Sequence, residues 1–185
     1  MQLFDLDGTI LDGNATLLLY YFCLKYNPKV IKYGPSTFAK LAKSGFNPAV
    51  FNDQPYPFRF IADTPGIHYT LDQFGEYLSD RIHPIFHERK KDEDIIATGS
   101  PEFALESLSK NLGVEIIGTK IDVDTGALNS PICIGDEKLK RVMEHINNEK
   151  IDTFYYDGDY DLPIENIAES THILKKGKII KSITH

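Results

Sequence analysis

The sequence is poor in cysteine: it has two, Cys23 and Cys133, and they lie far apart. A disulfide framework needs several cysteines, and a cysteine-based metal site needs closely spaced pairs such as CxxC, which the sequence lacks. We therefore expect two reduced, buried thiols. His83 and His87 are four residues apart, but neither an HExxH order nor a third ligand accompanies them, so zinc is not supported.

Long hydrophobic runs and an excess of positive charge are also missing. The most apolar stretch, residues 17–24, is far too short to span a bilayer, and the first residues lack the charged segment of a signal peptide. The net charge is -7 and the pI about 5.3, which gives no electrostatic reason to bind nucleic acid or an anionic membrane. We expect a cytoplasmic protein, and the sequence leaves its oligomeric state open.

What is present is an ordinary globular composition. Hydrophobic residues make up 42% and charged residues 25% of the 185 residues. Such a length suits one domain, or one domain with a modest insertion, and it is sufficient for a core without covalent staples.

The second half of the sequence alternates between two kinds of pattern. Short apolar runs typical of buried strands are followed by helical stretches, with strands expected at 94–98, 114–118 and 152–156 and helices at 101–112, 138–148 and 162–168. A small hairpin is expected at 121–128, and two short strands flanking Gly177 close the chain. The alternation indicates an α/β fold: a Rossmann-like parallel sheet with helices on both faces.

The residues after the first expected strand, at 1–4, interrupt this alternation. Asn14 is predicted to cap a helix that ends before Pro28, and a second helix is predicted from Thr70, interrupted by Pro84. Fifteen of the 21 Phe and Tyr residues lie between positions 12 and 92, most of them expected to build a core and a few to line a cavity. We predict a catalytic core of residues 1–13 and 93–185, with residues 14–92 inserted as a mostly helical cap.

The first candidate site is FDLDGT, residues 4–9. Asp5 and Asp7 follow the end of a strand, where the loops of a parallel sheet form a ligand-binding crevice, and Gly8 permits a sharp turn there. One carboxylate can attack phosphorus while the other transfers a proton. By composition alone, an acidic turn or a calcium-type loop is an equally good interpretation.

Two further loops follow strands of the same expected sheet. In ATGSP, the Thr98 hydroxyl, Gly99 and a helix N-terminus suit a phosphoryl oxygen, or Ser100 is a plain helix cap. In DGDYD, residues 157–161, carboxylates would repel one another without a cation, so the loop fits Mg²⁺ or is a solvated acidic turn. Lys138 would add a positive charge. Together these groups predict a phosphoryl-transfer site.

These motifs, in this order, resemble the haloacid dehalogenase-like superfamily, in particular its phosphoserine-phosphatase-like branch (subfamily IB type). FDLDGT is similar to the first motif, ATGSPEF to the second, CIGDEK to the lysine motif and YYDGDYDLP to the fourth. The resemblance covers residues 1–13 and about 93–170. It implies a helical cap of the C1 type, and Asp7, which the family's dehalogenases lack, favours phosphatase chemistry.

The resemblance also implies roles for the catalytic residues. Asp5 is expected to form an aspartyl-phosphate intermediate, with Asp7 as general acid and base. Thr98 is expected to bind the transferred phosphoryl group, and Lys138 to stabilise its charge. The other residues expected around a small-molecule phosphate ester are Gly8, Thr9, Gly99, Ser100 and, from the cap, Arg59.

The implied metal is Mg²⁺. Asp5 and Asp157 are expected to ligate it, Asp7 to help through its backbone carbonyl, and Asp161 to ligate directly or through water. Tyr156 and Gly158 depart from the family pattern around the fourth-motif aspartate, so Asp159 competes with Asp161 for this role.

The substrate is not determined by these motifs. Asn14 stands about where true phosphoserine phosphatases carry a glutamate, so phosphoserine is in question. Besides a small-molecule phosphatase, two alternatives stay open: a phosphotransferase or mutase that uses the same intermediate, and a catalytically inactive binding protein with this fold.

Overall fold

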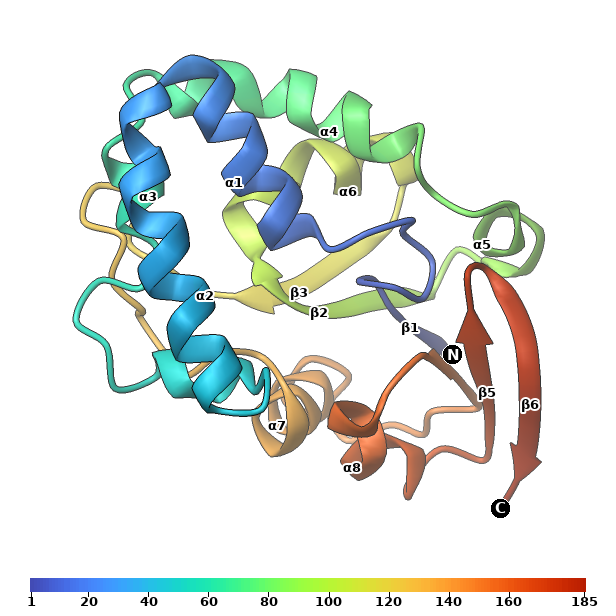
Figure 1. Ribbon diagram of the computed structural model, residues 1–185. Helices are drawn as coiled ribbons and strands as arrows, with labels where there is room; N and C mark the ends of the chain where they lie inside the picture. Colours follow the sequence, from blue (N-terminus) through green and yellow to red (C-terminus); the bar gives the residue numbers. More distant parts are fainter.

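The computed structural model describes all 185 residues apart from the side chain of Asp159. A six-stranded sheet forms its centre, in the order β3-β2-β1-β4-β5-β6 (Figure 1). The strands along the chain are β1 (Gln2–Asp5), β2 (Ile95–Pro101), β3 (Glu115–Thr119), β4 (Thr153–Tyr156), β5 (Ser170–Lys175) and β6 (Lys178–Thr184). The first five are parallel and β6 pairs antiparallel to β5, which confirms the expected α/β fold.

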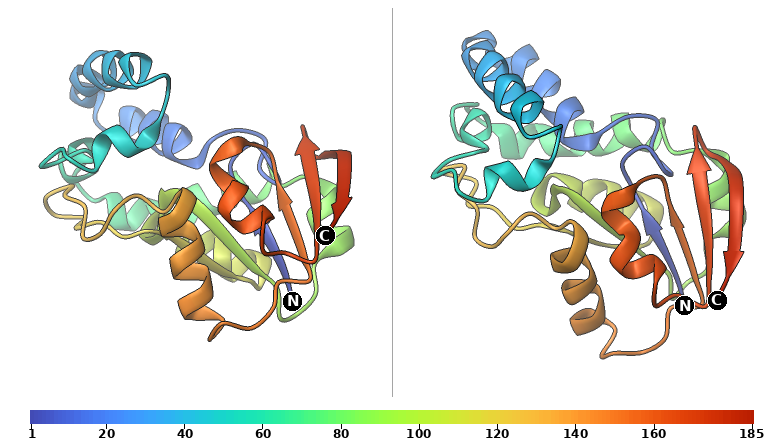
Figure 2. Two further views of the ribbon diagram at one scale, coloured as in Figure 1. Left: turned by 90° about the horizontal axis from the view of Figure 1, so that it is seen from below. Right: turned by 60° about the horizontal axis from the view of Figure 1, so that its bottom comes forward.

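The sheet is buried on both faces because neighbouring residues of a strand point to opposite sides. In β1, Leu3 belongs to one hydrophobic cluster and Phe4 to the other. Helices α7 (Gly135–His145) and α8 (Leu162–Glu165) contribute residues to the cluster around Leu3, so both helices pack on the same face of the sheet (Figure 2). On the other side, the ring of Phe4 stacks on Tyr155 at 4.5 Å between centroids.

The segment between β1 and β2 is helical. Its α-helices are α1 (Ala15–Tyr26), α2 (Tyr33–Lys43), α3 (Arg59–Ala62), α4 (Leu71–Ser79) and α5 (Pro84–Arg89). Short 3-10 helices at Pro28–Lys32, Pro48–Phe51 and Ile67–Thr70 connect them. The expected start of the first helix is confirmed, because the Asn14 side chain accepts a hydrogen bond from the Leu17 N–H at 2.9 Å.

This segment has two parts that contact different regions. Helices α1 and α2 lie beyond the carboxyl ends of the strands (Figure 2). Helices α4 and α5 pack along the sheet instead: Phe86 of α5 meets Phe4 edge-on at 5.1 Å between ring centroids, and α4 lies against α6 (Glu106–Leu112). The second part therefore covers the sheet face opposite α7.

Some element boundaries differ from the sequence prediction. The helix expected at 138–148 begins three residues earlier, at Gly135, so Lys138 lies in its first full turn rather than at its start. The helix expected at 101–112 opens as a 3-10 turn, Glu102–Leu105, because β2 continues through Pro101. The helix expected at 162–168 is a single turn.

Two connections were predicted correctly. Ile121 and Leu128 form an antiparallel bridge, so residues 121–128 make the expected hairpin, and the Gly126 carbonyl accepts a hydrogen bond from the Phe58 N–H at 3.0 Å. β5 and β6 are joined through Lys176 and Gly177, both at positive φ, as a tight right-twisted hairpin turn requires. Among the described residues, no helix has the length and apolar character needed to cross a membrane.

The packing of α4 on α6 predicts an unusual effect of an alanine substitution. A Cβ at Gly75 would lie 2.5 Å from Ser107 Cβ and 2.9 Å from the Leu108 backbone nitrogen, so the helices would have to separate. In an isolated helix, a Gly to Ala substitution would stabilise the helix by up to about 1 kcal/mol. Gly75→Ala should instead lower the free energy of unfolding by about 1–3 kcal/mol. Urea unfolding measures this.

The control is Glu76→Ala, at the next, exposed position of the same helix. It should change the free energy of unfolding by no more than about 0.5 kcal/mol. A Gly75→Ala protein as stable as the wild type would contradict the close approach of α4 and α6.

Candidate active site

The residues of the sequence motifs meet at the carboxyl ends of three neighbouring strands. Asp5 is the last residue of β1, Thr98 lies in β2 and Asp157 directly follows β4. Since β1 pairs with both β2 and β4, these loops adjoin. Lys138 reaches the same place from the first turn of α7.

Lys138 joins two carboxylates at the centre of the site. Its Nζ atom lies 2.8 Å from Asp5 Oδ1 and 2.5 Å from Asp161 Oδ1, and all three side chains are buried. Burial opposes the positive charge of Lys138, but the charges of Asp5 and Asp161 outweigh it and raise the pKa of Lys138. The lysine is therefore charged at neutral pH, as the prediction of a local cation requires.

One lysine does not neutralise the carboxylates around it. Asp5, Asp157 and Asp161 each place an oxygen within 4.8 Å of the others. Partial burial and the charges of Asp5 and Asp7 raise the pKa of Asp157 to about 6, although the residue is exposed to solvent. Burial and the charge of Asp5 also raise the pKa of Asp161. Burial and the crowding of like charges therefore disfavour the ionised states of Asp157 and Asp161.

Gly8 lets the first loop pass close to this cluster. Its φ of +78° favours glycine, and an added Cβ would lie 2.2 Å from Asp157 Oδ2. The neighbouring Thr9 is buried, and its hydroxyl donates to Asp5 Oδ2 at 2.8 Å. Asp5 thus has both carboxylate oxygens fixed, one by Thr9 and one by Lys138.

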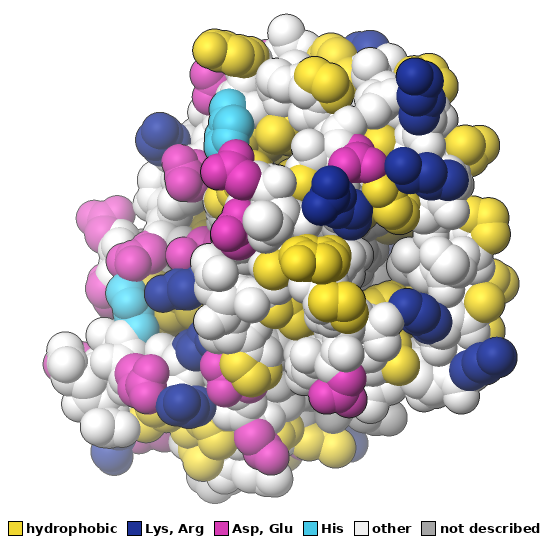
Figure 3. All heavy atoms as spheres, turned by 90° about the vertical axis from the view of Figure 1, so that its left-hand side faces the viewer, with side chains coloured by type: hydrophobic (Ala, Val, Ile, Leu, Met, Phe, Trp, Pro, Cys, Tyr) yellow, Lys and Arg dark blue, Asp and Glu magenta, His cyan; other side chains and the backbone are white. Residues whose placement is uncertain are grey.

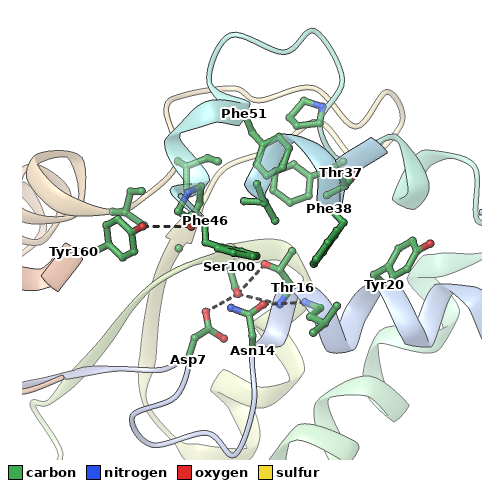
Figure 4. A pocket seen from close by; sticks show the side chains of 18 of the residues that line it. Asp7, Asn14, Thr16, Tyr20, Thr37, Phe38, Phe46, Phe51, Ser100 and Tyr160 are labelled. Atoms are coloured by element: carbon green, nitrogen blue, oxygen red, sulfur yellow. Dashed lines mark hydrogen bonds between the residues drawn. The ribbon is translucent and has the colours of Figure 1, made fainter. Parts of the chain in front are cut away.

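Asp7 points to a different set of partners. Its Oδ1 accepts from the Ala15 N–H at 2.5 Å, at the start of α1, and its Oδ2 accepts from the Thr98 hydroxyl at 2.9 Å. The same Oδ2 accepts from the Ser100 hydroxyl at 2.7 Å (Figure 4). Burial and the charge of Asp5 nevertheless raise the pKa of Asp7. A raised pKa favours the protonated form that a general acid needs.

The hydroxyls around Asp7 also connect the core to the helical segment. Ser100 Oγ accepts from the Thr16 N–H at 3.1 Å and lies 2.9 Å from Thr16 Oγ1. Because the single Ser100 proton is donated to Asp7, the Thr16 hydroxyl donates to Ser100. The role of Thr16 was not anticipated from the sequence, and its position two residues after the helix-capping Asn14 is the only local signal.

A cavity of about 590 Å³ opens above these groups. Asp5, Asp7, Ser100, Lys138 and Asp157 belong to its lining, as do Gly99 and Asp161. Figure 3 shows hydrophobic side chains gathered about a hollow on one side of the molecule. Three predicted site residues do not line the cavity but contact residues that do: Thr98 contacts Asp7, Thr9 contacts Asp5 and Gly8 lies against Asp157.

Arg59 does not point into the cavity, whereas its neighbours Phe58 and Phe60 line it. The Arg59 Nε atom lies 3.0 Å from Asp63 Oδ1, one turn along the chain. Hydrogen bonds from Tyr33, Lys32 and Arg59 lower the pKa of Asp63 to about 2. The spacing of four residues between Arg59 and Asp63 is the sequence signal that could have indicated this pair.

The three crowded carboxylates have the chemistry of a magnesium site. Mg²⁺ takes oxygen ligands and is commonly held by a few carboxylates together with water and phosphate oxygens. Asp5, Asp157 and Asp161 fit that requirement, and the Asp7 side chain is directed elsewhere. The alternative role of Asp159 falls on a side chain that the structure does not describe.

The ion pairs of Lys138 predict a large effect of its removal. Lys138→Met would leave Asp5 and Asp161 buried without their shared counterion, which should lower the free energy of unfolding by about 3–5 kcal/mol in a chelator-containing buffer. Urea unfolding measures the change. Lys140→Met is the control, since Lys140 is exposed and its ion pair with Glu144 is long, at 4.0 Å. Equal losses in the two variants would contradict the buried pairing.

Comparison with known proteins bears on this arrangement. A family model of haloacid dehalogenase-like hydrolases matches residues 3–164, and no match was found among curated proteins.

Solved structures share the fold at low sequence identity. A protein of unknown function from Bordetella pertussis Tohama I is 15% identical with a TM-score of 0.65, over 91% of this chain and 87% of that one. Cytosolic 5'-nucleotidase IIIB bound to cytidine is 11% identical with a TM-score of 0.60, over 90% and 68%. A probable phosphoserine phosphatase from Vibrio cholerae is 18% identical with a TM-score of 0.53, over 90% and 54%. With most of its length matched by the family model, the chain belongs to the haloacid dehalogenase-like hydrolases, as its motifs led us to expect.

Proposed function

We propose that this protein is a magnesium-dependent phosphatase that hydrolyses a small-molecule phosphate monoester through an aspartyl-phosphate intermediate. The observation that carries the proposal is the contact of Lys138 with Asp5 at the floor of a cavity, beside the carboxylates of Asp157 and Asp161. A nucleophile, a fixed cation and a group of metal-binding oxygens are thereby within reach of one phosphate.

In the first step, an Asp5 oxygen attacks phosphorus and the bond from phosphorus to the ester oxygen breaks. The leaving alcohol takes a proton from Asp7, whose raised pKa favours the acid form. Lys138 stays beside Asp5 and balances negative charge on the transferred group.

In the second step, Asp7 accepts a proton from water, which attacks phosphorus and breaks its bond to Asp5. Inorganic phosphate leaves and both aspartates return to their initial states. Asp5, Asp157 and Asp161 would hold Mg²⁺, which shields the negative charges of the phosphate and the nucleophile from each other. Thr98 and Ser100 keep Asp7 in position through their hydroxyls.

The helical segment, in this proposal, is divided between cap and core. Helices α1 to α3 lie over the cavity and act as the cap that selects the substrate. Helices α4 and α5, although within the predicted cap of residues 14–92, belong with the core because they pack on β1 and α6.

Replacement of the nucleophile tests the reaction. Asp5→Asn should lower Mg²⁺-dependent phosphate release from para-nitrophenyl phosphate by at least about 10³-fold, because the amide does not form the acyl phosphate. Asp92→Asn, an exposed aspartate in the turn before β2, should retain full activity. Undiminished activity of Asp5→Asn would exclude this mechanism.

Replacement of Asp157 tests the metal. Asp157→Asn removes one charged oxygen from the three-carboxylate group, so the Mg²⁺ concentration for half-maximal activity should rise at least about tenfold. The measurement is a Mg²⁺ titration of chelator-treated protein, followed through phosphate release. An unchanged titration curve would show that Asp157 does not contribute to Mg²⁺ binding.

A further inference from the structure

The cavity above Asp5 has walls whose chemistry differs from that of its floor. Carboxylates and one lysine form the floor, whereas apolar side chains form most of the rest. The main apolar residues are Leu17, Phe38, Leu41, Phe46, Phe51 and Phe58. Figure 4 shows Phe38, Phe46 and Phe51 above the hydrogen bond between Asp7 and Ser100, with Tyr160 beside them. A molecule whose phosphate reaches Asp5 therefore places its remaining body against these side chains.

Several of these apolar side chains are open to water in the protein alone. Phe38 is 63% exposed, Phe46 is 58% exposed and Leu17 is 49% exposed. Helix α2, which carries Phe38 and Leu41, has no buried residue at all. Exposed aromatic side chains gathered around a cavity are typical of a ligand site, because a bound apolar group would remove them from water.

The charges in the cavity argue against a second acidic group on the ligand. Among the described residues that line it, Lys138 is the only cationic one, and it already contacts Asp5 and Asp161. Arg59 is held by Asp63 instead. Among these lining residues, a carboxylate or second phosphate on the substrate would find four aspartates and no cationic side chain beyond Lys138, while the proposed Mg²⁺ would be taken by the transferred phosphate.

The neutral polar groups in the cavity are mostly engaged as well. Thr16 and Ser100 bond each other, and the Asn14 side-chain oxygen caps α1. A sugar or another polyhydroxylated body would lose hydrogen bonds to water and regain few from these walls.

We propose that the substrate is the monophosphate ester of an uncharged, largely apolar alcohol, aliphatic or aromatic. The phosphate is the single anionic group and binds at Asp5 and Lys138, while the apolar body lies against Phe38 and Phe46. This inference names the substrate class of the proposed phosphatase and rests on that function. Phosphoserine and sugar phosphates lack the apolar body, and in nucleoside monophosphates a polar ribose separates the base from the phosphate.

Phe46 offers a variant that should fold without difficulty. Its φ is +65°, a conformation that is costly for a bulky residue and easy for glycine, and its side chain is exposed. The Tyr160 hydroxyl donates to the Phe46 carbonyl oxygen at 3.3 Å, and this hydrogen bond does not need the Phe46 side chain. Phe46→Gly therefore removes an aromatic wall while it relieves backbone strain. Phe38→Ala likewise replaces an exposed side chain in α2 by a good helix former.

The first measurement is kcat/KM for ethyl, butyl and hexyl phosphate with Mg²⁺. Each added methylene should raise kcat/KM about fourfold, mainly through KM, since a buried methylene contributes about 0.8 kcal/mol. Phe46→Gly and Phe38→Ala should each reduce the preference for hexyl over ethyl phosphate by about tenfold. Tyr69→Ala, an aromatic side chain 90% exposed and outside the cavity lining, should leave this preference unchanged.

The outcomes separate this inference from the proposed function. The substrate class would be wrong if phosphoserine, glucose 6-phosphate or adenosine monophosphate had a higher kcat/KM than hexyl phosphate. If that hydrolysis depended on Asp5, the proposed phosphatase function would still hold. Equal kcat/KM across the alkyl series would overturn the substrate class too.

A binding experiment does not depend on turnover. Hexylphosphonate, which is not hydrolysed, should raise the thermal midpoint of the Mg²⁺-loaded protein more than methylphosphonate does, and Phe46→Gly should make this difference smaller. That result without hydrolysis of any ester would support the ligand class and refute the phosphatase. Equal shifts with the two phosphonates would refute the ligand class.

Discussion

The position of Lys138 between Asp5 and Asp161 is the constraint on which the remaining site depends. These three groups come from β1, from α7 and from the loop after β4, and all are buried, so both carboxylates depend on the lysine between them as a counterion. The distances require that the loops after two paired strands and the first turn of α7 are fixed relative to one another. That arrangement also holds Asp157 beside Asp5 and creates the group of oxygens suited to a divalent cation.

A second set of contacts links this centre to the helices over the cavity. Asp7 accepts hydrogen bonds from the start of α1 and from Thr98 and Ser100 of β2, and Ser100 is bonded to Thr16. Movement of α1 would therefore displace the proposed general acid. In the proposed mechanism, substrate selection and proton transfer would then be coupled through the N-terminus of α1.

The net charge of -7 makes the apolar character of the cavity informative. An acidic protein that binds an anion needs local compensation, and Lys138 with a divalent cation would supply it only at the floor. Further from the floor, the walls offer contact area rather than charge. In the proposed function, the affinity for a single phosphate and the affinity for an apolar body would therefore arise in different parts of one cavity.

The sequence by itself determined the sheet, the family and the residues at the ends of the strands. Strand positions follow from short apolar runs, and FDLDGT, ATGSP and DGDYD are local motifs whose residues are close in sequence. The start of α1 at Asn14 was likewise predictable, since capping is a contact across three residues. The turn of β5 into β6 at Gly177 is local too.

Only the tertiary structure decided which of these groups face one another. The Thr98 hydroxyl donates to Asp7 across 91 residues, and Lys138 meets Asp5 across 133. Phe38 and Phe46 line the cavity while other aromatic residues build the core. The physical reason is that the local pattern of residues determines the secondary structure of a segment and which of its faces is apolar. Side-chain contacts between segments that are distant in sequence depend on how those segments pack.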